Sequence, residues 1–403
     1  MVSLPETGTL RLAARVHFGY GARAQLTEVV RSHGRRVLAV VDPFLLRTRF
    51  FDELIGGLTE AGLDVLVHSA ITPELPVDTL DAAGAVARTH GADVIVAVGG
   101  GSALDAAKVI ALLATYEGPL SRYYGENLVP GPVTPVVAVP TTAGTGSEVT
   151  PVAVISDPER ELKVGISSPF LVPAAAIVDP ELTLDAPAPV TAFSGIDALV
   201  HAIESYTARE LEIDWSAPLP VFTGRNALIE PIALRAAGHL GPWLPVAVAE
   251  PGNRQARGEV AMGSLLGGMA FGSTGTHLCH ALQYPIGALT KTPHGLGTGL
   301  MLPYVLDALR ATPAIADRIA ALGAALEGTP SSSAERTLAR IIEINRAIGV
   351  PATLADIGVA RDQLPRLADL ALQSRRLIAI APIEPDRDVL LDILERAHDG
   401  GLR

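Results

Sequence analysis

The residues that decide the fold are Asp93-Val94-Ile95-Val96-Ala97-Val98, followed directly by Gly99-Gly100-Gly101-Ser102 and by a helical pattern from Ala103 to Lys108. The first run is short, apolar and rich in valine, which predicts a buried strand. The glycines let the chain turn sharply into a helix whose first N–H groups can approach a phosphate. A merely tight turn would use the same glycines, and the run is not the G-x-G-x-x-G fingerprint. It therefore indicates a nucleotide site without establishing one.

The same strand pattern recurs on both sides of this stretch. Apolar runs occupy 36–42, 63–68, 134–139 and 174–178, helical patterns occupy 23–33 and 77–90, and a β-hairpin is predicted for 152–155 with 162–166. Near-continuous apolar strands separated by helices predict a mostly parallel sheet that is covered on both faces. We therefore expect a Rossmann-like α/β domain over residues 1–186.

A second domain is expected to be entirely helical and to span 187–403. The proline-rich run Asp185-Ala186-Pro187-Ala188-Pro189 before it is expected to resist regular structure and to act as a hinge. Helices are predicted over 191–207, 225–240, 255–269, 304–309 with flanks, 314–326, 333–348 and 388–398. Thr191 or Ser194 is the expected cap of the first helix, and the serines 331–333 mark the start of a later one.

The composition favours a large globular protein. The chain has 403 residues, of which 48% are hydrophobic and 18% charged, and its length predicts two domains. A net charge of -12 disfavours nucleic acid and anionic membrane surfaces as partners. The single cysteine, Cys279, excludes an internal disulfide and fits the reducing cytoplasm. Residues 1–6 lack the pattern of a secretion signal, and glycines and charges interrupt 94–115, so no membrane span is expected.

Two further features suit a nicotinamide dinucleotide. Thr141, Thr142, Thr145 and Ser147 lie in the loop after the strand 134–139. Their hydroxyls can donate to a pyrophosphate or to a nicotinamide carboxamide. Asp42 ends the strand 36–42, where a carboxylate can accept a hydrogen bond from a ribose 2′-OH and would repel a 2′-phosphate. This favours NAD over NADP, although aspartate is also common in such turns for local reasons.

Four residues farther along the chain could bind a divalent transition metal. Asp197 and His201 are four residues apart in an apolar helical pattern, so their side chains share one face. His280 follows the glycine-containing segment 272–275, and His294 lies between Pro293 and Gly295. Three imidazoles and one carboxylate suit Fe²⁺ or Zn²⁺. Each of these residues alone is more often structural, so the prediction depends on the four together.

Taken together, the motifs resemble the iron-containing (group III) alcohol dehydrogenase family. They are Phe18-Gly19-Tyr20-Gly21, the run from Gly99 to Ser102 with Asp105 and Lys108, the loop from Pro140 to Thr150, the run from Gly195 to Ala202, His280 with His294 fourteen residues later, and Ile348-Gly349-Val350-Pro351. The resemblance implies that Asp197, His201, His280 and His294 bind the metal, usually Fe²⁺ and sometimes Zn²⁺. The candidate cofactor contacts are Asp42, Gly99, Gly100, Gly101, Ser102, Asp105, Thr141, Thr142, Thr145, Ser147, Lys163 and Leu182.

The resemblance also implies an activity. An N-terminal domain that binds NAD(P) and a helical domain that binds the metal would form an active site in the cleft between them. The expected reaction is hydride transfer between a primary or secondary alcohol and the nicotinamide, with the metal polarising the substrate oxygen. The expected partners are a small alcohol, aldehyde or hydroxy acid and further copies of the chain, in a homodimer or a larger homo-oligomer.

Three alternatives remain open at this point. A hydroxyacid–oxoacid transhydrogenase with tightly bound NAD is one, because His277-Leu278-Cys279-His280 with Tyr284-Pro285-Ile286 resembles that group locally. A maleylacetate reductase works without metal and is disfavoured by four intact ligands. A non-catalytic NAD-binding protein is disfavoured because binding a nucleotide requires no metal site.

One position departs from the family. Many members carry a further histidine four residues after the third ligand, and here Tyr284 stands there. A phenol with a reference pKa of about 10 relays a proton less readily at neutral pH. His277, about one helical turn before His280, could replace the missing histidine. Alternatively Tyr284 shapes the pocket and His277 supports the ligands, so both are candidate catalytic residues.

Overall fold

The computed structural model describes residues 7–72 and 74–403. The described residues divide into two compact units, one of Arg11–Leu184 and one that joins residues 7–10 to Asp185–Arg403. Residues 7–10 thus group with the helical unit and not with the sheet. The reason is local, because Ala227 N–H donates to the Thr7 carbonyl at 3.0 Å and the Asn226 side-chain amide donates to the Thr9 carbonyl. Residues 1–6, which carried the expectation about a secretion signal, lie outside the described residues.

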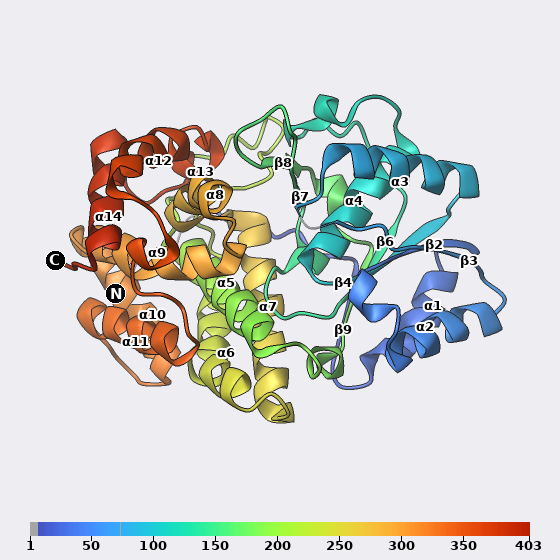
Figure 1. The fold of residues 1–403 in the computed structure, drawn as a ribbon, viewed down its shortest axis with the longest axis horizontal. Coiled ribbons are helices and arrows are strands. Elements are labelled where there is room, and N and C mark those ends of the chain that lie inside the picture. Colours follow the sequence, from blue (N-terminus) through green and yellow to red (C-terminus); the bar gives the residue numbers. More distant parts are fainter. Residues whose placement is uncertain (1–6, 73) are drawn as a thin grey trace. The chain divides into compact units, whose positions relative to one another are not determined.

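The sheet unit contains six parallel strands in the order β1-β9-β6-β4-β2-β3 (Figure 1). Their bounds are Arg15–Phe18 for β1, Arg36–Val41 for β2, Asp64–His68 for β3, Val94–Gly99 for β4, Val136–Pro140 for β6 and Ala175–Val178 for β9. A second sheet has the order β5-β8-β7, with bounds Gly125–Glu126, Val164–Ser167 and Val152–Ile155. The predicted hairpin is confirmed, because β7 and β8 pair antiparallel. The short strands β1 and β5 were not predicted.

Helices cover both faces of the six-stranded sheet (Figure 1). Their bounds are Leu26–Arg31 for α1, Arg49–Glu60 for α2, Val77–His90 for α3 and Gly101–Thr115 for α4. Val37 and Ala39 of β2 face the core made with α1 and α2, whereas Leu38 and Val40 face the core made with α3 and α4. A strand buried on both faces needs apolar residues at every position. This is why the run was continuous rather than alternating, and the predicted α/β class is confirmed.

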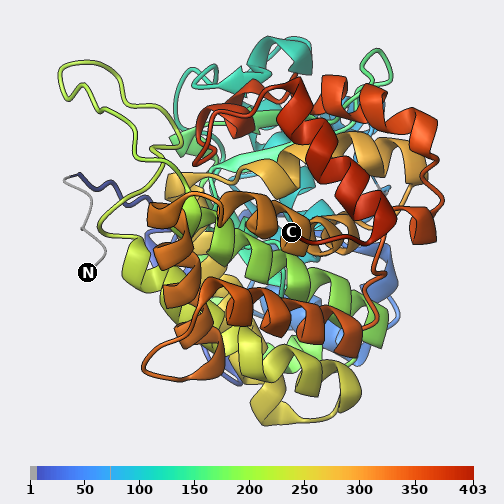
Figure 2. The ribbon, with the colours of Figure 1, turned by 90° about the vertical axis from the view of Figure 1, so that its left-hand side faces the viewer.

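The second unit is helical, as predicted. Its helices are α5 (Ala188–Thr207), α6 (Glu230–Ala249), α7 (Arg254–Thr274), α8 (Leu278–Thr290), α9 (His294–Leu309), α10 (Pro313–Glu327), α11 (Ala334–Ala347), α12 (Leu364–Ala371), α13 (Arg375–Ala379) and α14 (Arg387–Asp399). The helix α5 packs against α6, α7 and α9. The loop between α5 and α6, which carries the exposed Trp215, reaches away from these helices (Figure 2).

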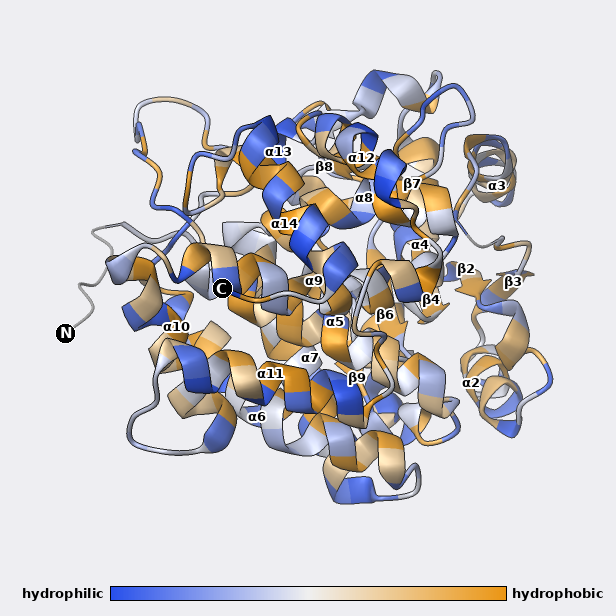
Figure 3. Cartoon of the chain, turned by 60° about the vertical axis from the view of Figure 1, so that its left-hand side comes forward, coloured by the Kyte–Doolittle hydropathy of each residue, from blue (hydrophilic) through white to orange (hydrophobic). Residues whose placement is uncertain are grey.

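The outer helices of this unit are amphipathic. In α11 and α14 hydrophilic and hydrophobic residues alternate along the helix (Figure 3), and Ala334, Leu338, Ile341 and Ile344 of α11 are buried. This spacing of three and four residues is the pattern of a helix that packs on one side only. Among the described residues, no helix combines the length and the apolar character that crossing a bilayer requires.

The start of α5 corrects one prediction. The run 185–189 was expected to resist regular structure, yet α5 begins at Ala188 and includes Pro189 in its first turn. Proline is tolerated there because the first N–H groups of a helix have no partner within the helix. Neither Thr191 nor Ser194 caps α5, because both lie inside it and Pro187 occupies the N-cap position.

Two further helices test the predicted bounds and caps. The helix α6 begins at Glu230 instead of 225 and continues through Pro242 and Pro245 to Ala249, so the proline positions did not end it. The predicted cap among the serines is confirmed, because the Ser333 hydroxyl accepts a hydrogen bond from Arg336 N–H at 3.1 Å.

Candidate metal centre and nucleotide-binding loops

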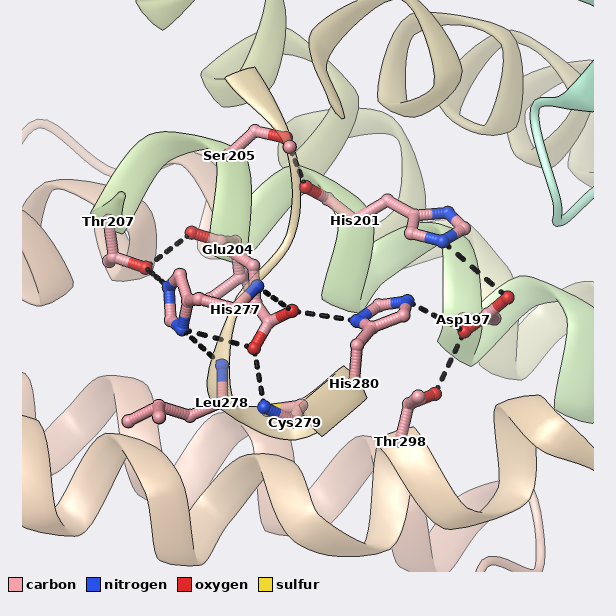
Figure 4. A network of polar contacts seen from close by, with 12 residues as sticks. Asp197, His201, Glu204, Ser205, Thr207, His277, Leu278, Cys279, His280 and Thr298 are labelled. Carbon is pink, nitrogen blue, oxygen red and sulfur yellow. Dashed lines mark hydrogen bonds and ion pairs between the residues drawn. The ribbon is translucent and has the colours of Figure 1, made fainter. Parts of the chain in front are cut away.

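Asp197 and His201 lie on one face of α5, as their spacing predicted. Both are almost fully buried, at 3% and 4% exposure. The Oδ2 atom of Asp197 lies 3.7 Å from Nε2 of His201 (Figure 4). The helix can bury these polar groups because its other residues are mainly apolar or small and pack against three neighbouring helices.

His280 and His294 approach the same carboxylate from α8 and α9. Oδ1 of Asp197 lies 3.9 Å from Nε2 of His280 and 3.7 Å from Nε2 of His294. His294 is the first residue of α9, and Gly295 follows it. A Cβ at Gly295 would lie 1.9 Å from the Phe193 carbonyl oxygen, so only glycine lets α9 come this close to α5.

The arrangement fits a divalent metal. Asp197, His280 and His294 offer ligand atoms that all lie within 4.8 Å of one another. Ligand atoms about 2.1 Å from a tetrahedral ion are separated by about 3.4 Å, close to the observed spacing. His280 Nε2 is buried and has no hydrogen-bond partner among the described residues, which is costly unless it binds something. His201 stands outside the group of three and adjoins it through Asp197 and through its ring, which stacks on His280 at 5.0 Å.

Burial and mutual proximity set the protonation of the ligands. Burial, together with the neighbouring His201, lowers the pKa of His280 well below its ordinary value. Burial alone would raise the pKa of Asp197, but the imidazoles around it and the hydroxyl of Thr298 outweigh burial and lower that pKa. A neutral imidazole and an ionised carboxylate are the forms that bind a metal.

Three residues that the sequence analysis missed contact the candidate ligands. Glu204 Oε2 accepts a hydrogen bond from His280 Nδ1 at 2.7 Å, and the Thr298 hydroxyl donates to Asp197 Oδ1 at 2.9 Å. Phe271 stacks on the His201 ring with 4.2 Å between centroids.

Two of these residues carried a signal in the sequence. Glu204 lies three residues after His201 and seven after Asp197, and therefore on the same face of α5. Thr298 lies four residues after His294, on the same face of α9. No spacing of this kind marks Phe271, which belongs to another helix.

The two candidate catalytic residues have different surroundings. His277 is completely buried, with Nε2 at 2.9 Å from the Thr207 hydroxyl and Nδ1 at 3.1 Å from Glu204 Oε1. Both of its ring nitrogens thus face protein groups, and burial lowers its pKa. Tyr284 is only half-buried, and its ring centroid lies 6.2 Å from that of His294. Of the two, Tyr284 is the residue that a substrate at His294 could touch.

In the sheet unit, the candidate cofactor residues lie at the carboxyl ends of three adjacent strands. Asp42 follows β2, Gly99 ends β4, and Thr141 follows β6. The chain places β3 on one side of β2 and β4 on the other, which creates a topological switch point between β2 and β4. Open α/β sheets bind ligands at such points.

Glycines let these strand ends approach one another. Gly99 has φ +150°, and a Cβ there would lie 2.8 Å from Cβ of Asp42. A Cβ at Gly101 would lie 2.5 Å from Cγ2 of Thr145. The helix α4 begins after Gly100 without a side-chain cap. Its first N–H groups are therefore available to an anion.

Asp105 and Ser147 face each other inside the sheet unit. The Ser147 hydroxyl donates to Asp105 Oδ1 at 2.5 Å, and Val154 N–H donates to the other carboxylate oxygen at 2.9 Å. The buried Lys108 donates to the carbonyls of Thr150 and Val152 at 2.9 and 2.8 Å. These bonds brace the loop that carries the threonines.

The remaining candidate cofactor residues are more scattered. Ser102 is exposed in the first turn of α4, and Thr142 is half-buried opposite Gly100. Lys163 Nζ lies 3.0 Å from a carboxylate oxygen of Glu74. Leu182 packs against the sheet core from the 3₁₀ turn Pro180–Thr183.

Comparison with known proteins gives consistent matches. Residues 13–180 match the family model described as iron-containing alcohol dehydrogenase, and residues 191–398 match that of the Fe-containing alcohol dehydrogenase family, C-terminal. Long-chain-alcohol dehydrogenase 1 of Geobacillus thermodenitrificans (strain NG80-2) is 35% identical over 378 residues, which are 91% of each chain. The NAD-dependent methanol dehydrogenase of Bacillus methanolicus is 34% identical over 360 residues, 88% of this chain and 91% of that protein.

A solved structure agrees with these matches. The crystal structure of a 1,3-propanediol oxidoreductase superposes with a TM-score of 0.89 at 32% identity and covers 97% of this chain and 100% of its own. The fold and the matches together define an oxidoreductase that acts on CH–OH groups. More particularly, the chain belongs to the iron-containing alcohol dehydrogenase family, and the resemblance seen in the sequence is confirmed.

Proposed function

We propose that this protein is a metal-dependent, NAD-linked alcohol dehydrogenase that also reduces aldehydes. The observation that carries the proposal is the convergence of three imidazole Nε2 atoms, at 3.7, 3.9 and 3.7 Å, on the carboxylate of Asp197. No structural role requires two buried histidines and a partly exposed one to face a single buried carboxylate, and charged or polar groups are costly to bury without a partner. The residues that would bind the metal are Asp197, His201, His280 and His294.

The metal and the nicotinamide, when bound, supply a Lewis acid for the substrate oxygen and an acceptor or donor of hydride. The chain's own groups do the positioning. The hydroxyl of Thr298 fixes the carboxylate of Asp197, and Glu204 fixes the ring of His280. Such supporting bonds determine which lone pair a ligand presents.

Binding of NAD would use the strand ends of the sheet unit. One oxygen of Asp42 accepts from Phe44 N–H at 3.0 Å, and its other oxygen accepts no hydrogen bond from the described residues. That oxygen would accept from a ribose hydroxyl and would repel a 2′-phosphate. The uncapped first turn of α4 would bind the pyrophosphate. The name of the NAD-dependent methanol dehydrogenase among the relatives supports the same choice.

Proton transfer is assigned to Tyr284 or to water and not to His277. His277 is completely buried, and Thr207 and Glu204 lie within 3.1 Å of its two ring nitrogens. A group so enclosed cannot reach a substrate hydroxyl. We propose a supporting role for His277 and a place beside the substrate for Tyr284.

The test is metal removal and reloading. The protein is stripped with a chelator, reloaded with Fe²⁺ without oxygen or with Zn²⁺, and assayed on alcohols, aldehydes and 2-hydroxy acids with NAD or NADP. We expect turnover only after reloading, with NAD preferred. Full turnover by the stripped protein would contradict the proposal. Hydride exchange between a hydroxy acid and an oxo acid, without release of free NADH from an alcohol, would identify the transhydrogenase instead.

We further propose that the protein works in the cytoplasm as a homodimer or larger homo-oligomer. The buried free thiol of Cys279 fits a reducing compartment. Light scattering coupled to size-exclusion chromatography measures the assembly directly, and a mass of one chain would contradict this part.

A further inference from the structure

The carboxylate of Glu204 is completely buried in the last turn of α5 and lies against the start of α8 (Figure 4). Its Oε2 atom accepts from His277 N–H at 2.9 Å, and its Oε1 atom accepts from Cys279 N–H at 2.6 Å. The ring Nδ1 of His280 lies 2.7 Å from the same Oε2. Three N–H groups therefore converge on one carboxylate, and no neutral side chain offers two acceptor oxygens for them.

Two of these donors belong to the N-terminus of α8. The first N–H groups of a helix lack partners within the helix, and they carry the positive end of its dipole. The side chain of the N-cap residue, His277, accepts from Leu278 N–H through its ring Nδ1 at 2.8 Å. Glu204 thus completes the cap of α8 although it belongs to α5. Its negative charge is stabilised in the interior by the helix that it caps.

The third donor belongs to a candidate metal ligand. A hydrogen bond from Nδ1–H of His280 to Glu204 places the ring proton on Nδ1 and leaves the lone pair on Nε2. That atom lies 3.9 Å from Asp197 Oδ1 and has no other partner among the described residues. A carboxylate behind a ligating histidine fixes its tautomer and makes its other nitrogen a better donor to a metal.

The ring of His277 packs against Glu204 from the other side. Its Nδ1 accepts from Leu278 N–H at 2.8 Å and lies 3.1 Å from Glu204 Oε1, and its Nε2 lies 2.9 Å from the Thr207 hydroxyl. Because Nδ1 is the acceptor for Leu278 N–H, the neutral ring donates no hydrogen bond to the carboxylate from this atom. Thr207 ends α5 one turn after Glu204, so the ring lies against the same turn that carries the acid. The position of Glu204 is therefore determined by α5 and by the N–H groups at the start of α8.

We propose that Glu204 is a positioning residue for the metal site, in which one carboxylate sets both the start of α8 and the orientation of His280. The start of α8 and the affinity for the metal are coupled through it. The inference rests on the proposed function, because it assumes that the ligand cluster binds a divalent ion. A residue that only capped a helix would affect stability and leave the metal untouched.

The experiment compares E204Q with the wild-type chain. Glutamine keeps the size but has one acceptor oxygen, so its NH₂ group must face either Cys279 N–H or the donors on the other side. Zn²⁺ affinity is measured by competition with a chelator, and Co²⁺-loaded protein reports ligand geometry through its visible absorption. We expect Zn²⁺ affinity to fall about 10–100-fold and the Co²⁺ bands to shift. The melting temperature of the metal-free protein should also fall.

The matched control is Asp386→Ala. Asp386 caps α14 by accepting from Val389 N–H at 2.9 Å, at an exposed position outside the ligand cluster. D386A should lower the melting temperature while leaving the Zn²⁺ affinity and the Co²⁺ spectrum as in the wild type. Weaker Zn²⁺ binding in D386A as well would mean that loss of stability alone weakens the site, and would overturn the inference.

If E204Q does not fold, the same Zn²⁺ measurement is made on Glu204→Asp. It keeps the charge but withdraws the carboxylate, which then cannot reach α8 and His280 together, so weaker Zn²⁺ binding is expected again. Wild-type Zn²⁺ affinity in E204Q or, where that variant is unfolded, in E204D overturns the inference. A wild-type chain that binds no divalent metal contradicts the proposed function instead, so the two failures are distinguishable.

Discussion

The two units build their candidate sites from different material. In the sheet unit the site consists of strand ends, glycines and short hydroxyl side chains, and its position follows from the topology of the sheet. In the helical unit the site consists of long side chains from α5, α8 and α9 that meet at the carboxylate of Asp197. The first site depends on backbone shape and the second on side-chain chemistry. Substitutions in the helical unit should therefore change metal binding and turnover. Substitutions in the sheet unit should change the free energy of unfolding and the affinity for NAD.

The largest effect is expected at His280. Its replacement by alanine removes one proposed ligand and the hydrogen bond between its ring and the Glu204 carboxylate. Loss of several kcal/mol of Lewis-acid stabilisation lowers the catalytic efficiency by about 1,000-fold or more. We expect H280A to lose bound metal and turnover together, as measured by metal analysis and steady-state kinetics on the same sample.

The control for this prediction is His239→Ala. His239 is also a helical histidine paired with a carboxylate, since its Nδ1 lies 2.6 Å from Glu259, but it is no part of the ligand cluster. H239A should retain metal and turnover. Normal turnover by H280A with full metal occupancy would refute the assignment of this ligand.

The candidate nucleotide site of the sheet unit, which depends on backbone shape, is tested at two neighbouring glycines. Gly99 has φ +150°, and an added Cβ would meet Ala103 Cβ at 2.7 Å. Strain of this kind costs about 2–3 kcal/mol, so G99A should lower the free energy of unfolding by that amount. Gly100 has an ordinary φ, and an added Cβ would meet only Thr142, at 3.4 Å. G100A should therefore change the free energy of unfolding by less than about 0.5 kcal/mol.

The affinity for NAD distinguishes an effect on the nucleotide site from an effect on stability in this pair of variants. Gly100 is the N-cap of α4 and adjoins the first turn, where the pyrophosphate is expected, and a Cβ added there would lie beside Thr142. Loss of one charge-assisted hydrogen bond, about 1.5–3 kcal/mol, corresponds to roughly 10–100-fold weaker binding. Calorimetric titration of G100A with NAD should show this at unchanged stability. Binding as tight as in the wild type would place the pyrophosphate elsewhere.

The sequence predicted the two units unequally well. Strands buried on both faces and glycines at strand ends have local signatures, so the parallel sheet and its turns could be recognised along the chain. The candidate ligands of the helical unit could be proposed from the sequence because Asp197 and His201 share one helix. Phe271 could not, because it reaches His201 from α7, and only the packing of α7 on α5 brings the two rings together.

The helix ends show the same limit. The proline-rich run 185–189 suggested a break, but a helix accepts proline in its first turn, where α5 carries Pro189. The predicted helix 225–240 was also too short at its end, because α6 continues through Pro242 and Pro245. The sequence could not choose between the two roles considered for His277. Its spacing from His280 allowed a proton relay or a supporting role, whereas its complete burial between Glu204 and Thr207 depends on how α5 and α8 pack.

The next smaller effect concerns Asp42, the carboxylate that we expect to face the ribose of the nucleotide. Asp42→Asn keeps the size and an acceptor oxygen for Phe44 N–H but removes the charge. We expect the preference for NAD over NADP, measured as the ratio of their catalytic efficiencies, to fall by about 10–100-fold, because a charge-assisted hydrogen bond is lost and the repulsion of a 2′-phosphate disappears. An unchanged ratio, measured with both cofactors on one enzyme sample, would remove Asp42 from the site.

The smallest effect is expected at Tyr284. The question there is whether its hydroxyl relays a proton or only shapes the substrate pocket. Its ring lies 6.2 Å from that of His294, and its reference pKa of about 10 makes it a poor proton relay at neutral pH. General acid–base catalysis contributes about 100- to 10,000-fold, so a relay should be conspicuous when removed. We expect Tyr284→Phe to slow turnover by less than about tenfold, with the changes falling mainly on KM and differing between short and long alcohols. Turnover slowed by about 100-fold or more, and restored by Tyr284→His, would instead make this hydroxyl the relay and would show that the helical site depends on a residue beyond its ligands and their supports.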